Sequence, residues 1–179
     1  MRLFHVSEEA NIAQFVPRLP TRKDLDPTVA LVWAINEQCL PNFFTPRKCP
    51  RITYHADEQS SAEDIVWFFS GHSRHAICIE QAWHKAMLAC TLYIYEFDPA
   101  QFVLQDDIAG YYVSTQAQTP IGVTRVDDIY GALFARNIEV RLLDNLWPLE
   151  RVVKQSTLRW SICDFALATP PAVFDGFPL

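Results

Sequence analysis

The segment TLYIYEFDP, residues 91 to 99, carries the clearest strand signal in the chain. Its aliphatic residues alternate with aromatic ones, and these are residue types that fit the half-buried surface of a sheet. An Asp-Pro pair ends the run, because proline cannot donate to a strand ladder. The segment therefore predicts one strand of a sheet, bounded by a turn at Asp98 and Pro99.

Strand and helix patterns alternate irregularly on both sides of this segment. Further strands are predicted at residues 2–6, 28–35 (TVALVWAI), 51–56 (RITYHA), 109–115 (AGYYVST), 139–146 (EVRLLDNL) and 159–168 (RWSICDFALA). Helices are predicted at residues 60–69, 76–89, 126–137 and 148–157, with a short helix broken by prolines after Asn36. The first of these helices opens with Ser60 and Ser61, each followed three residues later by an acid, which is typical of a capped helix start. This order lacks a regular strand–helix repeat and favours an α+β fold over a doubly wound sheet. We expect a single domain, residues 1–179, with a mostly antiparallel, twisted sheet or split β-sandwich and short flanking helices.

Composition narrows the classes of function. The chain has 179 residues, 50% hydrophobic residues and a net charge of −6, which indicates an ordered domain and disfavours nonspecific nucleic-acid binding. A local basic stretch, TPRKCPR at residues 45–51, is an exception to the negative balance. The five glycines are scattered, so no phosphate-binding loop or dinucleotide fingerprint is expected. The absence of a long apolar run, an early acidic N-terminus and scattered cysteines favour a cytoplasmic protein with reduced thiols and no membrane span.

His5 and Ser7 are the first candidate site residues. They alternate with Phe4 and Val6 in the first predicted strand and therefore share one face of it. A histidine in such a place can simply be half-buried and hydrogen-bonded to the backbone, with the serine capping the next turn. It can also be the first contact to a ligand, and the residues alone leave both interpretations open.

Glu80 and His84 form a second candidate group. In the predicted helix they are four residues apart and share a face, where a carboxylate can raise the basicity of an imidazole. Apolar neighbours suggest that Glu80 is enclosed, in which case Arg51 or Arg74 could compensate its charge. A purely structural role for the carboxylate is the favoured alternative.

Two weaker signals complete the candidates. Glu96 shares a strand face with two aliphatic residues and could have a raised pKa, but the favoured alternative is that the strand has reached solvent there. Metal-competent side chains occur at His55, His72 and His75, with Cys49 and Cys78 nearby in the sequence, but their spacing matches no zinc pattern. No metal site is therefore predicted. A hydrolase remains possible from residue types, without a nucleophile elbow.

Several stretches together resemble a small family of uncharacterised bacterial proteins. These are LFHVSEE near the start, VWAINEQCLPNFFTPRKCPRIT, IEQAW, the end of the YEFDP strand, AGYYVS and DNLWPL. The resemblance covers most of the chain and implies no particular activity.

The layout is also similar, more distantly, to that of the ADP-ribosyltransferase superfamily. The similarity lies in the first-strand LFHVS, in VWAI with the following LPNFF, and in YYVS with the following TPI. This superfamily binds NAD in a split β-sandwich, and its histidine-containing branch uses a first-strand histidine to hold a ribose hydroxyl. The resemblance implies that His5 contacts the ribose, that Ser7 lies beside it, and that Tyr54 or Tyr112 stacks on the nicotinamide.

One departure from that layout bears on turnover. The superfamily's catalytic glutamate would be expected around AGYYVS, where this chain has Gly110 and no acid. Either Glu80 or Glu96 then supplies the carboxylate that stabilises the charged transition state, or the chain binds a nucleotide without turning it over. The chain's negative charge also suits a pyrophosphate poorly, unless Arg47, Lys48 and Arg51 form a local cradle.

Two functions of different classes follow. The first is an ADP-ribosyltransferase-like domain that binds NAD or a related nucleotide, with His5 and Glu80 as catalytic candidates and His5, Ser7, Arg51, Tyr54 and Tyr112 as binding candidates. Its reaction would be transfer to a macromolecule or NAD hydrolysis. The alternative is a noncatalytic binding or interaction module whose aromatic residues line a pocket or a homodimer face. A metal-dependent hydrolase is a third, minor hypothesis.

Overall fold

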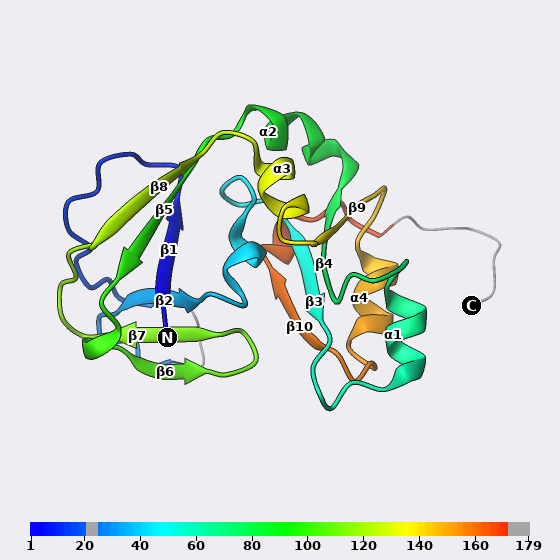
Figure 1. Cartoon of the computed structure of the whole chain (residues 1–179), viewed down its shortest axis with the longest axis horizontal. Helices are drawn as coiled ribbons and strands as arrows, with labels where there is room; N and C mark the ends of the chain where they lie inside the picture. Colours follow the sequence, from blue (N-terminus) through cyan, green and yellow to red (C-terminus); the bar gives the residue numbers. More distant parts are fainter. Residues whose placement is uncertain (21–24, 172–179) are drawn as a thin grey trace. The chain divides into compact units, whose positions relative to one another are not determined.

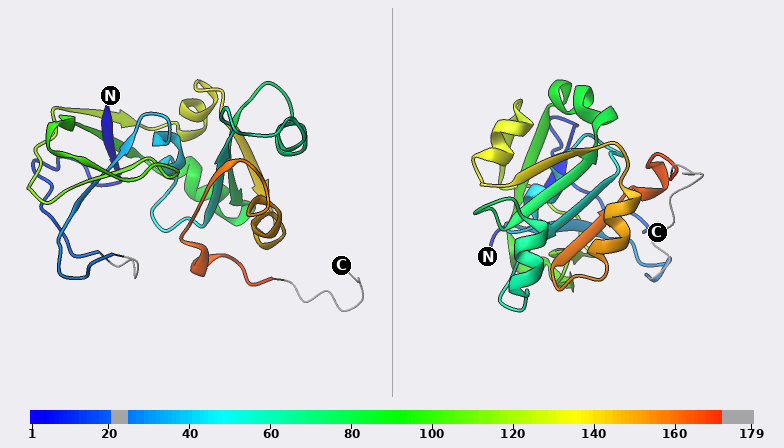
Figure 2. Two further views of the ribbon diagram at one scale, coloured as in Figure 1. Left: turned by 90° about the horizontal axis from the view of Figure 1, so that it is seen from below. Right: turned by 90° about the vertical axis from the view of Figure 1, so that its right-hand side faces the viewer.

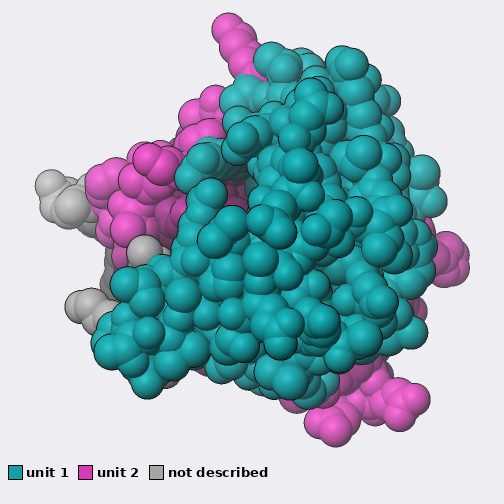
Figure 3. Space-filling model, turned by 90° about the vertical axis from the view of Figure 1, so that its left-hand side faces the viewer, with its two compact units in different colours: residues 1–47, 86–136 teal, residues 48–85, 137–179 magenta. Residues whose placement is uncertain are grey.

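The computed structural model describes residues 1–20 and 25–171 and has an α+β fold (Figure 1). Its strands form a six-stranded antiparallel sheet and a four-stranded mixed sheet, accompanied by short helices, which confirms the predicted fold class. The chain divides into two compact units, coloured separately in Figure 3, and each is described by itself. Unit 1 comprises Met1–Arg47 and Ala86–Arg136, and unit 2 comprises Lys48–Lys85 and Asn137–Leu179. The single-domain organisation stays a prediction.

Unit 1 is built on the six-stranded sheet, in the order β6-β7-β2-β1-β5-β8. The strands are β1 (Leu3–Ser7), β2 (Val32–Asn36), β5 (Leu92–Phe97), β6 (Val103–Asp106), β7 (Tyr111–Ser114) and β8 (Gly122–Val126). β1 pairs with β5 along its whole length, from Leu3 opposite Phe97 to Ser7 opposite Tyr93. Its registered pairing with β2 covers only Leu3 and Phe4, so His5 lies where these two strands stop pairing.

One face of this sheet is covered by the segment that follows β1. Two isolated bridges, Phe15 with Gln118 and Arg18 with Leu31, hold that segment in place. The Phe15 ring lies 5.1 Å from that of Tyr95 and 5.0 Å from that of Phe97 between ring centroids. A buried cluster beneath it contains Leu3, Val32, Ala34, Phe97 and Phe102, with Phe15 and Tyr112 packed against it. The burial of these rings stabilises the face that carries His5.

Unit 2 is built on the four-stranded sheet, in the order β10-β3-β4-β9. Its strands are β3 (Arg51–His55), β4 (His75–Glu80), β9 (Glu139–Leu143) and β10 (Arg159–Cys163), and β4 and β9 are parallel. Helices α1 (Ala62–Phe68) and α4 (Trp147–Val153) lie on the same face of the sheet (Figures 1 and 2). Their apolar residues enclose a core with Ile52, Tyr54 and Cys78 of the sheet.

The remaining helices are short. They are α2 (His84–Ala89) and α3 (Ile129–Phe134), with the 3₁₀ turns η1 (Leu40–Phe43), η2 (Gln81–Trp83), η3 (Pro99–Gln101) and η4 (Phe165–Leu167). The capping start predicted for the helix at residue 60 is confirmed, because Ser61 Oγ accepts the Asp64 N–H at 3.1 Å. Within the described residues, no helix is long and apolar enough to span a membrane.

The prediction of a helix over residues 76–89 is wrong for its first half. His75–Glu80 is strand β4, paired with β3 on one side and β9 on the other, and only the residues after Glu80 turn helical. Both faces of this strand are covered, since Ile77, Cys78 and Ile79 are almost inaccessible. Such a strand shows a continuous apolar run with no period of two, so length and periodicity cannot separate it from a buried helix. Glu80 and His84 therefore do not share a helix face.

Several predicted boundaries also change, among them the end of β9 at Leu143 rather than Leu146. β2 begins at Val32 rather than Thr28, and the last strand stops at Cys163, where Asp164 adopts a left-handed backbone. β6 and β8, the two edge strands of unit 1, were not predicted. Their side chains are largely exposed, so they lack the apolar alternation that marks a half-buried strand.

Candidate functional site

His5 is fixed by contacts on two sides of its ring. Its Nδ1 lies 3.1 Å from the Trp33 carbonyl oxygen, and its ring centroid lies 4.8 Å from that of Phe15. A carbonyl can only accept, so Nδ1 carries the proton and donates. In the neutral ring Nε2 then keeps a lone pair, and no hydrogen bond reaches it from the described residues. The imidazole is thus held as a hydrogen-bond acceptor of defined orientation.

The charge state of His5 follows from its surroundings. Burial lowers its pKa from the ordinary value, the hydrogen bond to the Trp33 carbonyl opposes that shift, and the positive charge of Arg18 lowers the pKa further. A histidine with a pKa below 6.5 is neutral at pH 7. His5 therefore offers a neutral acceptor to a ligand hydroxyl rather than a cation to an anion.

Arg18 was not among the candidates from the sequence. It is exposed, and its backbone is bonded to Leu31 by N–H···O contacts of 3.0 and 2.9 Å. This bridge places the Arg18 charge near enough to His5 to affect the imidazole pKa. No local pattern links residues 5, 18 and 31, because their proximity depends on a bridge made within the folded chain. Arg18 thus contributes a positive charge that acts on the His5 imidazole.

Ser7 and Tyr112 lie in the same unit as His5. Ser7 Oγ accepts the Glu9 N–H at 3.0 Å, the turn-capping role expected of a serine at a strand end. Tyr112 lies on β7 opposite Ala34, is half-buried and packs against the cluster that contains Leu3. Their roles in ligand binding stay predictions.

Arg51 and Glu80 lie together at one end of the sheet of unit 2. Arg51, 5% exposed, donates to the Cys49 carbonyl and to Asp164 Oδ2, both at 3.2 Å. Glu80, 2% exposed, accepts the Thr169 N–H at 2.9 Å and the Thr169 hydroxyl at 2.8 Å. Arg51 thus has an acidic partner and Glu80 has two hydrogen-bond donors inside the unit, as buried polar groups require. The proposed set divides between the units, with His5, Ser7 and Tyr112 in unit 1 and Arg51, Tyr54 and Glu80 in unit 2.

Tyr54 lies in the core of unit 2. It is fully buried, and its ring contacts those of Phe68 and Phe69 at centroid distances of 5.4 and 5.5 Å. Its hydroxyl donates to the Phe68 carbonyl at 3.2 Å, and burial raises its pKa far above the ordinary value. The ring already has partners in the core, so we leave Tyr54 out of the function proposed below.

Glu96 and the histidines were considered for acid–base chemistry and for metal binding. Glu96 forms two 2.8 Å hydrogen bonds with the Arg2 guanidinium, which hold the pKa of the carboxyl below its usual range. The raised pKa considered for Glu96 is therefore wrong. Among the described residues, no group of three or more histidine, cysteine or acidic side chains is arranged to hold a metal ion.

The anchoring role of Glu80 gives a direct prediction. We expect Glu80→Ala to lower the free energy of unfolding by about 2 kcal/mol, because the Thr169 N–H and hydroxyl lose a charged acceptor. Hydrogen exchange of the full chain should show loss of protection at the Thr169 amide. Glu80→Gln, which keeps one acceptor oxygen, should lose less, and Glu58→Gln in an exposed turn should lose nothing. Unchanged Thr169 protection in Glu80→Ala would contradict an anchoring role.

One protein-family model matches most of the chain. The model is that of a family of unknown function, DUF6886, and it matches residues 4–168. The chain belongs to DUF6886. The matched range includes His5, Arg18, Arg51 and Glu80, and this membership agrees with the resemblance to a small uncharacterised family. No curated protein and no solved structure matches the DUF6886 chain.

Gly110 of the DUF6886 chain occupies a place that excludes a larger side chain. Its φ is +67°, in the left-handed region that favours glycine. A Cβ built there would lie 2.6 Å from Asn36 Oδ1, whose side chain accepts the Cys39 N–H at 2.8 Å. A glutamate at position 110 would meet both backbone strain and a collision. The absence of an acid there thus agrees with the local backbone.

Proposed function

We propose that the DUF6886 protein binds NAD or a related nucleotide at His5 and Arg18 of unit 1 and does not cleave it. The observation that carries the proposal is the fixed imidazole of His5, with Nδ1 bonded to the Trp33 carbonyl at 3.1 Å. The bond defines the tautomer, so Nε2 is the acceptor for a ribose hydroxyl. The similarity of the first strand to the ADP-ribosyltransferase layout supports a nucleotide as the ligand.

Arg18 is assigned to the phosphate groups of the ligand. Arginine binds phosphate through two parallel N–H donors, and its guanidinium stays charged at any physiological pH. The backbone bridge from Arg18 to Leu31 holds it two residues from Trp33, whose carbonyl accepts from His5, and its positive charge acts on the imidazole. An imidazole nitrogen that accepts from a hydroxyl, together with a guanidinium that binds phosphate, suits a ribose phosphate better than nicotinamide alone.

Gly110 supports the lack of turnover. Catalysis of nicotinamide loss needs a negative charge near the ribose C1 centre as positive charge develops there. The strand end where the superfamily layout places this carboxylate holds Gly110, and Asn36 fills the space beside it. Glu80 is engaged with Thr169 in unit 2 and is not assigned a catalytic role here.

Thermal shift with three ligands tests the proposal. With NAD and ADP-ribose at about 1 mM we expect a rise in Tm, since a ligand that binds only the folded state stabilises it by mass action. Nicotinamide alone should give no shift. Loss of a charge-assisted phosphate contact in Arg18→Ala should weaken binding about 10-fold or more, and His5→Phe, which keeps a ring against Phe15, should weaken it similarly.

Arg47→Ala is the matched control. Arg47 is an exposed arginine of the same unit in the basic stretch at residues 45–51, which the sequence suggested as a phosphate cradle. The proposed site leaves Arg47 out, so its substitution separates binding at Arg18 from attraction by that stretch. It should bind like the parent chain. No shift with any of the three ligands, or equal losses in Arg18→Ala and Arg47→Ala, would overturn the His5–Arg18 site. Release of nicotinamide from NAD above the buffer rate would overturn the lack of turnover.

A further inference from the structure

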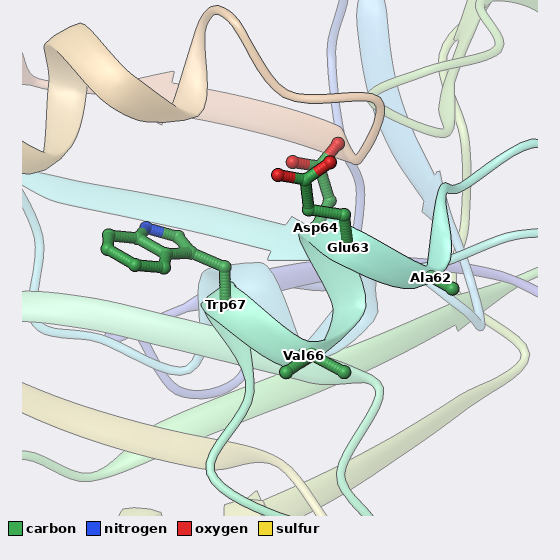
Figure 4. A pocket seen from close by; sticks show the side chains of 5 residues that line it. All are labelled: Ala62, Glu63, Asp64, Val66 and Trp67. Atoms are coloured by element: carbon green, nitrogen blue, oxygen red, sulfur yellow. The ribbon is translucent and has the colours of Figure 1, made fainter.

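Helix α1 of unit 2 exposes a tryptophan that its own core does not use. Trp67 is 76% exposed and Val66 is 80% exposed, whereas the next residue, Phe68, is 4% exposed and belongs to the core. Ala62, Glu63, Asp64, Val66 and Trp67 line a shallow depression along the helix. Figure 4 shows Trp67 on the same side of α1 as Glu63, with Val66 directed away from them. Tryptophan is enriched in protein interfaces relative to the rest of the surface.

The helix is held without Trp67. Phe68 and the partly buried Ile65 pack into the core, where the Phe68 ring contacts Tyr54. Ser61 caps the first turn, and Asp64 Oδ2 accepts both the N–H and the hydroxyl of Thr157 at 2.6 Å. These contacts fix α1 from its buried side. The exposed side of α1, which carries Glu63 and Trp67, is therefore held in place without these two side chains. We call this side the platform.

Glu63 gives the platform its charge. It is exposed, lies one turn before Trp67 at the i, i+4 spacing that places two side chains side by side, and has no ion-pair partner among the described residues. The neighbouring Asp64 carboxylate is already engaged with Thr157. An indole face beside an uncompensated carboxylate is complementary to a cation. Arginine fits best, because its planar guanidinium stacks on an aromatic ring and also binds a carboxylate through two donors.

We propose that Glu63 and Trp67 on α1 bind an arginine side chain in a short peptide segment of a protein partner. The small size of the surface favours a short peptide over a second folded chain as the ligand. A seven-residue helix is about 10 Å long, too small for the roughly 800 Å² that each partner contributes to a stable interface between folded chains. A second copy of the chain would also bring two Glu63 carboxylates together. This site is independent of the nucleotide proposed for unit 1.

A titration followed by NMR tests the arginine site. The probe is acetyl-Gly-Ala-Arg-Ala-Gly-amide, added to the ¹⁵N-labelled full chain, and the readout is the Trp67 indole N–H signal, assigned by its loss in Trp67→Phe. The matched peptide carries citrulline, which has the shape of arginine without its charge. We expect saturable shifts with the arginine peptide only. Trp67→Ala and Glu63→Gln should each weaken binding about 2- to 5-fold, the size of an exposed cation–π or ion-pair contact.

Glu58→Gln is the charge-matched control, since Glu58 is an exposed acid of unit 2 outside α1. Its affinity for the arginine peptide should equal that of the parent chain. The site is overturned if the citrulline peptide binds equally well, if Glu58→Gln loses as much as Glu63→Gln, or if the Trp67 signal does not move. Trp67 is exposed, so its substitution leaves the fold intact and the result interpretable.

Discussion

Tyr54→Ala is expected to lower the free energy of unfolding by about 3–5 kcal/mol, the cost of truncating a large ring in a packed core. Tyr54 is fully buried on β3, between the rings of Phe68 and Phe69. The cavity cannot close easily, because Phe68 ends α1 and Cys78 lies in the central strand β4. Urea denaturation of the full chain, followed by circular dichroism, measures the effect.

Two variants separate packing from the hydroxyl group. Tyr54→Phe should cost only about 1 kcal/mol, because the Phe68 carbonyl keeps the Arg141 guanidinium as a donor at 2.6 Å. Trp67→Ala, which removes an exposed ring, should stay within about 0.5 kcal/mol of the parent chain. An unchanged free energy of unfolding in Tyr54→Ala would contradict the packing role of this ring in the core.

The second large effect is expected on acidification, and it comes from two histidines of unit 2. His55 and His75 lie directly opposite each other on β3 and β4, with ring centroids 5.3 Å apart. Burial lowers the pKa of both, that of His75 to about 3, with the other histidine as a further cause for His75. Arg159 lies opposite His55 on β10 and lowers the pKa of His55 further, whereas Asp57 raises it.

The direction of the pH effect follows from proton binding. In the unfolded chain an imidazole has a pKa near 6.5, so below that pH the unfolded state binds more protons than the folded state. The stabilisation that depends on a neutral His75 is therefore fully present above pH 6.5. It is lost as the pH falls towards the pKa of His75 in the folded state, which is about 3. For His75 the loss at pH 5 is about 2 kcal/mol and continues to grow at lower pH.

His75→Gln tests this prediction. Urea denaturation between pH 7 and 5 should show a smaller loss of stability than in the parent chain. Asp57 and Asp64 have lowered pKa values, so the stabilisation from their charged forms is lost only below about pH 4. The titration of these two carboxyl groups therefore lies outside this pH window. His72→Gln, at an exposed position of the same segment, should leave the slope unchanged. Equal slopes in the parent chain and His75→Gln would contradict the assignment to His75.

Local patterns were sufficient where a segment has one buried face and clear ends. The strands at residues 92–97, 51–55 and 111–114 and the capped helix at residues 62–68 lie within the predicted segments. They failed at His75–Glu80, where burial of both faces removes the alternation, and at β6 and β8, where exposure removes it. The strands that the sequence missed thus lie at the centre of one sheet and at both edges of the other.

The candidate site shows the same limit. The sequence indicated His5 as a residue on the first strand, but its tautomer depends on the Trp33 carbonyl, which belongs to the next strand. Arg18 was missed because a bridge to Leu31 places it. Glu80 was correctly expected to be buried, yet its partner is Thr169, which lies 89 positions away, rather than an arginine.

The sequence by itself determined the α+β class, most strands, the capped start of α1 and the burial of Glu80, because propensity and side-chain alternation act over a few residues. Tertiary structure decided which strands pair, that residues 75–80 extend between β3 and β9, and which groups surround His5, Tyr54 and Glu80. Those outcomes depend on contacts between distant segments, whose free energy comes from burial and hydrogen bonding in the folded chain. The roles of the side chains follow from these contacts.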